Sequence, residues 1–246
     1  DTTVPTDTLF HRVGFPGKYT GLIKSAFRPS DDATTLPFFI PANAMMSVSL
    51  REISKLFLSP PLNNTSAATR FEAFADEIEQ AIEKHGVVAS PLDPNQKMYA
   101  YEVDGYGSAY KMDDANVPSL LSLPYLGFIR KKEQKKIYNA TRQYILSQSN
   151  PYYFNGTAAA GIGSAHTTFG NIWPMSVIMQ ALTSDNDDEI LNCLKTLETT
   201  TAKTYFMHES FNKDNPLVYT RSWFAWCNSM FGELILMLAQ QKPYLI

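Results

Sequence analysis

A short polar segment in the last fifth of the chain holds the residue types that acid–base chemistry needs. His208 and Glu209 stand side by side in the segment MHESF, and Trp223 follows in a stretch of aromatic residues at helical spacing. A carboxylate can handle a proton or stabilise a cationic transition state, and aromatic rings stack on the apolar faces of sugars. The pattern fits a carbohydrate site, although aromatic residues at helical spacing more often form only a helix core.

A second acidic group follows an arginine near the amino end. Arg28 precedes Asp31 and Asp32 in the segment RPSDDA. Two close carboxylates resist double ionisation, so a neighbouring arginine can hold one ionised while the pKa of the other rises. Such a separation of pKa values allows one site to contain both an acid and a base. The alternative is that the two aspartates only cap the next helix.

Two polar motifs occupy the middle of the chain. Asp113 and Asp114 follow an expected β-hairpin in residues 97–112 and precede an expected helix from Val117. They either cap that helix, where anionic side chains are favoured, or bind sugar hydroxyls. His166 ends a glycine-containing run that lacks the remaining residues of a phosphate-binding loop. It is either structural or a hydroxyl ligand.

These segments resemble, in order, those of glycoside hydrolase family 125, the exo-α-1,6-mannosidases. The matching stretches are RPSDDA, EVDG with MDDANVPSLLSLPYLG, GIGSAHT, and MHESF with TRSWFAW. The resemblance spans nearly the whole chain, and Cys227 departs from it where a small residue is expected. It implies an exo-acting hydrolase that releases terminal α-1,6-linked mannose with inversion. Asp31 or Asp32 would then be the general acid, and Glu209 the general base.

The resemblance also implies the sugar-binding residues and the partner, a mannose-containing oligosaccharide. The candidate binding residues are Arg28, Asp113, Asp114, His166, His208, Arg221 and Trp223. Chemistry with two carboxylates needs no cofactor, and the sequence shows no metal-ligand spacing. An inverting enzyme leaves roughly 6.5–9.5 Å between its carboxyl groups for a water molecule. We expect that separation between Glu209 and Asp31 or Asp32.

The periodicity of apolar residues predicts a mostly helical chain. A short helical piece is expected near 19–26, and seven longer helices are expected at 41–58, 66–85, from 117, 130–149, 172–183, 187–203 and after an N-cap at Thr220. The family resemblance implies an all-α fold, an (α/α)6 barrel of twelve helices with a small β-hairpin insertion. We therefore expect residues 1–246 to form a single catalytic domain, the C-terminal portion of such a barrel. Its N-terminal remainder is expected to precede Asp1.

Composition limits the other possibilities. The chain has 246 residues, of which 44% are hydrophobic, enough for one large core. A formal net charge of -3 gives no support for a nucleic-acid partner, and no apolar run is long enough to span a membrane. Cys193 and Cys227 are expected to be buried thiols rather than a disulfide. Glycosylation sequons favour a secretory or extracellular location; they lie at Asn63, Asn64, Asn139 and Asn155.

Two other classes of function stay open at this stage. One is an enzyme of the same barrel with another specificity, such as an α-glucosidase or a polysaccharide lyase. A lyase would need a basic catalytic residue and an arginine cluster for a uronate, and no such cluster is visible. The other is a non-catalytic glycan-binding module. Release of mannose from α-1,6-mannobiose would separate these alternatives from an α-mannosidase.

Overall fold

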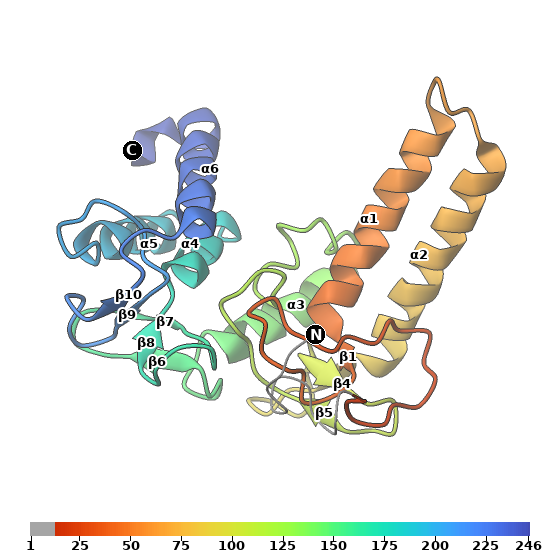
Figure 1. The fold of residues 1–246 in the computed structure, drawn as a ribbon, viewed down its shortest axis with the longest axis horizontal. Helices are drawn as coiled ribbons and strands as arrows, with labels where there is room; N and C mark the ends of the chain where they lie inside the picture. The colour runs from red at the N-terminus through yellow and green to blue at the C-terminus, as the bar shows by residue number, and fades with distance from the viewer. Residues whose placement is uncertain (1–12) are drawn as a thin grey trace. The chain divides into compact units, whose positions relative to one another are not determined.

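The computed structural model describes residues 13–246, which divide into two compact units. Among the described residues, the first unit contains residues 13–112 and Pro118–Gln143, and the second contains Asp113–Val117 and Tyr144–Ile246. Within the described residues the α-helices are α1 (Ile40–Leu58), α2 (Thr65–His85), α3 (Lys132–Ile145), α4 (Pro174–Leu182), α5 (Asp187–Thr199) and α6 (Ala225–Gln241) (Figure 1). A short 3-10 helix, Pro243–Leu245, follows α6.

In the part of the chain that the structure describes, short strands connect the helices and form four small antiparallel sheets. The strands are β1 (Phe38–Phe39), β2 (Val87–Ala89), β3 (Lys97–Tyr99), β4 (Glu102–Val103), β5 (Ala109–Tyr110), β6 (Tyr153–Asn155), β7 (Ala160–Ile162), β8 (Asn171–Ile172), β9 (Ser210–Asn212) and β10 (Tyr219–Thr220). The sheets are β1-β4-β5, β10-β9-β8, β2-β3 and β6-β7. The expected predominance of helix is confirmed. The expected all-α class with a single hairpin does not describe all of the structure, which contains several small sheets. The additional strands form because polar loops satisfy their backbone hydrogen-bonding groups by pairing with one another.

Helices α1 and α2 of the first unit run side by side as an antiparallel pair (Figure 1). Asn64 is the N-cap of α2, and its side chain accepts a hydrogen bond from the Ala67 amide at 3.0 Å. The N-cap therefore lies just before the expected Thr65 or Ser66. Between the helices, Arg51 Nη2 lies 2.7 Å from Glu79 Oε2, and the side chain of Glu79 is almost fully buried. Apolar packing and this ion pair hold the two helices together.

The expected hairpin around Asp104 and Gly105 is confirmed as β4 and β5. The Asp104 carboxylate accepts hydrogen bonds from the backbone amides of residues 106, 107 and 108 at 2.8–3.1 Å. Burial raises the pKa of Asp104, but these bonds and one from the Ser108 side chain outweigh it, so the pKa lies below its ordinary value. Gly105 has a φ of 79°, which the tight turn requires. The turn fixes Glu102 in β4, beside β1.

Three expected helices are absent or begin later in the structure. No helix forms near residues 19–26, which follow an irregular path. None forms from Val117, where Pro118 and Pro124 interrupt the chain and the Ser119 and Ser122 side chains bond to each other's backbone amides. The last helix starts at Ala225 rather than after Thr220, because Thr220 belongs to β10 and pairs with β9.

In the second unit, α4 packs against α5, α6 and β7. The core of this unit includes Trp173, Phe211 and Leu234, all with 1% or less of their surface exposed. Cys193 and Cys227 are both buried thiols that are not joined in a disulfide, as expected. Burial raises the pKa of Cys227, so this thiol stays protonated and packs as an apolar group.

Candidate active site

Arg28, Asp31 and Asp32 lie together in a tight loop of the first unit. Phe27 and Ala33 pair as an isolated antiparallel bridge across the base of the loop. Inside it, the Arg28 amide donates to the Asp32 carbonyl at 2.8 Å, and the Asp31 amide donates to the Arg28 carbonyl at 3.0 Å. The loop therefore has a defined conformation, rather than being the first turn of a helix.

The two aspartates differ in their surroundings. Asp31 is exposed and has a φ of 67°, the left-handed region that is uncommon for residues other than glycine. Asp32 is partly buried, and its Oδ2 accepts a hydrogen bond of 2.6 Å from the hydroxyl of buried Ser30. The backbone strain at Asp31 persists only where neighbouring structure imposes it, and such strain is common at functional sites.

Arg28 forms a buried ion pair with Glu102, a residue that sequence reasoning did not single out. Arg28 Nε lies 2.7 Å from Glu102 Oε1, and the side chains are 5% and 0% exposed. The guanidinium also lies over the rings of Tyr101 and Tyr110, with 5.3 and 5.7 Å to the ring centroids. Glu102 belongs to the EVDG motif, which the sequence shows. Its pairing with Arg28, 74 positions away, could not be predicted from the sequence.

Asp113 and Asp114 lie in the second unit, both almost fully buried. The Asp113 amide donates to Asn150 Oδ1 at 3.1 Å. Asp114 Oδ1 accepts from the Asn116 amide at 2.9 Å and from Asn116 Nδ2 at 2.7 Å, which closes a turn instead of capping a helix. Helix capping, one of the two expected alternatives, is therefore ruled out for Asp114 by the absence of a helix at 117.

The turn at Asp114 is joined directly to the loop that carries His166. Ser164 Oγ donates to Asp114 Oδ2 at 2.6 Å and accepts from the His166 amide at 3.1 Å. The Ala115 amide donates to the Gly163 carbonyl at 3.1 Å. Two motifs separated by about fifty residues are therefore brought into one hydrogen-bonded group, in which Asp114 holds the His166 loop.

Glu209 immediately precedes β9 in the second unit, and its amide donates to the Thr220 carbonyl of β10 at 3.2 Å. Its carboxylate lies 3.0 Å from Arg221 Nε. The glutamate side chain is 8% exposed and the arginine side chain 62% exposed. The sequence placed Glu209 and Arg221 in one motif region, and the β9–β10 pairing sets them against each other.

His208 is 1% exposed, and both of its ring nitrogens face backbone carbonyls. Nδ1 lies 3.0 Å from the Ser222 carbonyl and Nε2 lies 3.1 Å from the Thr201 carbonyl. The ring stacks on Tyr219, with centroids 3.9 Å apart and an interplanar angle of 5°. These contacts favour a role in holding the loops around Glu209 over direct contact with a sugar, and its predicted ligand role stays a prediction.

A line of aromatic contacts links the predicted residues of the second unit. The His166 ring lies 6.3 Å from Trp173, and Trp173 lies 5.9 Å from Phe224. The Arg221 guanidinium lies 5.6 Å from the Phe224 ring centroid. Sequence reasoning treated Trp173 and Phe224 only as helix residues; their role as a bridge between two motifs depends on tertiary packing.

Trp223 stands next to this line and is 56% exposed. An exposed tryptophan provides a flat apolar surface of the type on which a sugar ring stacks. Its predicted role as a sugar-binding residue remains a prediction, consistent with this exposure.

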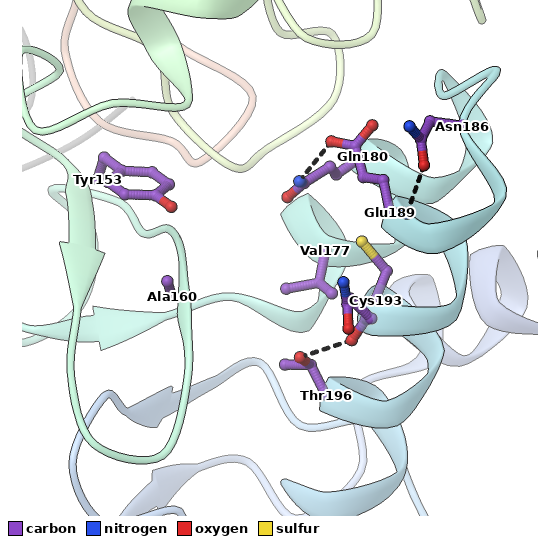
Figure 2. A pocket seen from close by; sticks show the side chains of 9 residues that line it. Tyr153, Ala160, Val177, Gln180, Asn186, Glu189, Cys193 and Thr196 are labelled. Carbon is purple, nitrogen blue, oxygen red and sulfur yellow. Dashed lines mark hydrogen bonds between the residues drawn. The ribbon is translucent and has the colours of Figure 1, made fainter.

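A separate pocket of about 460 Å³ lies in the second unit (Figure 2). Figure 2 shows Tyr153 and Ala160 on one side and residues of α4 and α5 on the other. Gln180 Nε2 donates to Glu189 Oε1 at 2.7 Å inside it. None of the motif residues lines this pocket, so we do not assign the candidate site to it.

Among residues 13–246, no group of three or more His, Cys, Asp or Glu side chains is arranged to hold a metal ion. Over the same range, no helix is both long enough and apolar enough to cross a membrane.

Residues 1–236 match the family described as metal-independent α-mannosidases, glycoside hydrolase family 125. The chain belongs to this family. The resemblance inferred from the four motifs is thereby confirmed.

Two relatives support the assignment. The chain is 49% identical over 235 residues to the Meiotically up-regulated gene 157 protein of Schizosaccharomyces pombe, covering 95% of this chain and 45% of that protein. It matches a structure of a metal-independent α-mannosidase from Streptococcus pneumoniae, a non-productive substrate complex with α-1,6-mannobiose, at a TM-score of 0.91 and 39% identity. That match covers 98% of this chain and 56% of the bacterial one. The chain thus spans about half the length of these relatives.

A more distant match shows similarity of fold alone. A bacterial glucoamylase complexed with acarbose aligns at a TM-score of 0.61 and 13% identity, over 80% of this chain and 33% of that one. The helical architecture is therefore shared with a second glycosidase.

Proposed function

We propose that this protein is an exo-acting α-mannosidase that releases terminal α-1,6-linked mannose from an oligosaccharide with inversion at the anomeric carbon. The observation that supports this most is the match to the Streptococcus pneumoniae structure, whose bound sugar is α-1,6-mannobiose, at a TM-score of 0.91. Family membership over residues 1–236 supports the same class of reaction. The matched glycosidases also support the proposal that these helices belong to an (α/α)6 barrel.

In this proposal, Asp31 or Asp32 protonates the glycosidic oxygen as the bond to the anomeric carbon breaks. Glu209 removes a proton from a water molecule that attacks the opposite face of the sugar. Arg221, 3.0 Å from Glu209, keeps the carboxylate in one orientation. The acid donates one proton and Glu209 accepts one, and neither forms a covalent bond to the sugar. The products are mannose and the shortened oligosaccharide.

The remaining predicted residues bind or shape the sugar site. Trp223 offers an exposed ring for stacking, and His166 is presented at an exposed position by the Asp114–Ser164 hydrogen bond. Asp113 stays a candidate for hydroxyl binding. Arg28 and His208, which are both buried, serve by holding the segments that carry the acid and the base.

The location of the protein in a secretory or extracellular compartment is part of the proposal and rests on the sequons. Asn63, Asn64, Asn139 and Asn155 are all exposed, so each is accessible to a glycosyltransferase. Treatment of protein from its natural source with an N-glycanase tests this point. A decrease in mass is expected, whereas an unchanged mass would contradict use of these sequons.

The decisive experiment is incubation of the protein, in its natural length, with α-1,6-mannobiose while one-dimensional proton NMR spectra are recorded. Free mannose is expected, with the β-anomer appearing first because inversion of an α-linkage produces it. Initial formation of the α-anomer would instead indicate retention. Binding without release of mannose would favour the glycan-binding module, and release from α-glucosides only would favour another specificity.

A further inference from the structure

Glu102 contacts both ends of the loop that carries Asp31 and Asp32. Its Oε1 accepts from Arg28 Nε, at the start of the loop, at 2.7 Å. Its Oε2 accepts from the backbone amides of Thr35 and Leu36, after the loop, at 2.8 and 2.9 Å. One carboxylate thus closes the segment 28–36 through three hydrogen bonds.

The anchor itself is rigid. Glu102 lies in β4, the central strand of the β1-β4-β5 sheet, and its side chain has no exposed surface. The Arg28 guanidinium is confined by the rings of Tyr101 and Tyr110, and its Nη2 also donates to Thr35 Oγ1 at 3.3 Å. A buried charge pair with this many bonds has one favourable geometry.

The loop needs such an anchor. Asp31 has a left-handed backbone conformation, which costs energy for a residue with a side chain and persists only where the surroundings impose it. If Glu102 releases either end, the loop can relax and the carboxyl groups of residues 31 and 32 move. A displacement of about 1 Å is enough to reduce a catalytic rate by about a hundredfold.

We infer that Glu102 is a positioning residue for the general acid: its carboxylate fixes the 28–36 loop so that Asp31 or Asp32 reaches the glycosidic oxygen. The inference rests on the proposed function. Glu102 itself neither contacts the sugar nor transfers a proton.

The test compares Glu102→Gln with the unaltered protein on two substrates. Natural-type α-1,6-mannobiose needs a general acid, whereas dinitrophenyl α-mannoside has a leaving group that departs without one. For Glu102→Gln we expect kcat on mannobiose to fall by at least about tenfold, with KM changed by less than about threefold. The rate on the dinitrophenyl substrate should stay within about threefold of the original.

Glu79→Gln is the matched control. Glu79 is also a buried carboxylate of the first unit, with ion pairs to Arg51, Arg130 and Lys131, but it lies in α2 and bonds to no residue of the 28–36 loop. Loss of its charge should lower thermal stability without separating the two substrates. The folded fraction of each variant, measured by circular dichroism, is used to normalise the rates.

A parallel decrease on both substrates would overturn the inference, because it would indicate general destabilisation or a role at the base. An unchanged mannobiose rate would overturn it as well. If Glu102→Gln does not fold, Glu102→Asp replaces it in the test. The aspartate keeps the charge but is too short to bond both ends of the loop. The rate on mannobiose should again fall while the rate on the dinitrophenyl substrate is retained. If the unaltered protein hydrolyses neither substrate, the proposed function fails instead.

Discussion

Arg221 Nε lies 3.0 Å from Glu209 Oε1, joining a carboxylate that is 8% exposed to an arginine side chain that is 62% exposed. Two neighbouring contacts set this geometry: the Glu209 amide bonds to the Thr220 carbonyl, and His208 Nδ1 lies 3.0 Å from the Ser222 carbonyl. Arg221 itself has a φ of 46°, so its backbone is held in the left-handed region. The direction of the Glu209 carboxylate is thus fixed by the β9–β10 pairing, by the buried His208 and by the strained backbone of Arg221.

Replacement of Glu209 by Gln should lower kcat by about a hundredfold or more for every mannoside, because the attacking water must be activated whatever the leaving group. Steady-state rates on mannobiose and on dinitrophenyl mannoside measure this, with circular dichroism to show that the variant is folded. Glu198→Gln, on the exposed face of α5, should behave like the original protein. Near-normal turnover by folded Glu209→Gln would remove this residue from the mechanism.

Replacement of the two loop aspartates one at a time should identify the acid. One of Asp31→Ala and Asp32→Ala should nearly abolish cleavage of mannobiose while sparing dinitrophenyl mannoside. The other should affect both substrates to a similar degree. Rates on the two substrates, measured in parallel, decide between them. Equal losses on both substrates in both variants would mean that the acid lies elsewhere, with Asp113 and Asp114 as the next candidates.

Replacement of Asp114 by Ala should lower the free energy of unfolding by about 1–3 kcal/mol, because buried donors on Asn116 and Ser164 lose their acceptor. Urea denaturation measures this change. Ser164→Ala alone should cost less, and the double variant should cost less than the sum, since the two residues share one hydrogen bond. Strict additivity in this cycle would show that the bond contributes nothing to stability.

The ion pairs of the buried Glu79 carboxylate should make stability depend on pH in the acidic range. Burial alone raises the pKa of Glu79, but hydrogen bonds from Lys131 and Arg51 and the charge of Arg130 lower it below the ordinary value of 4.5. Because the folded-state pKa is depressed, the stabilisation is present above pH 4.5 and is lost as the pH falls through the folded-state pKa. Urea midpoints at a series of pH values should fall less steeply with acidification in Glu79→Gln. Identical slopes for the two proteins would contradict this.

Much of the local structure could be predicted from the sequence. Apolar periodicity predicted α1 and α2 within one residue at each end, because amphipathic spacing and the stop signals at Pro60 and Gly86 act locally. The Asp104-Gly105 turn predicted the hairpin for the same reason. Where local signals competed, prediction failed: prolines and serine side chains prevented a helix at 117, and strand pairing took Thr220 from the last helix.

The sequence by itself determined which residue types the site contains, and through four ordered motifs it determined the family. Which residues contact one another was decided only by the tertiary structure. Glu102 pairs with Arg28 across 74 positions, and Ser164 joins Asp114 to the His166 loop across about fifty. The physical reason is that a buried charge or hydroxyl must find a partner, and that partner can come from any segment that packing brings near. No periodicity in the chain records that choice.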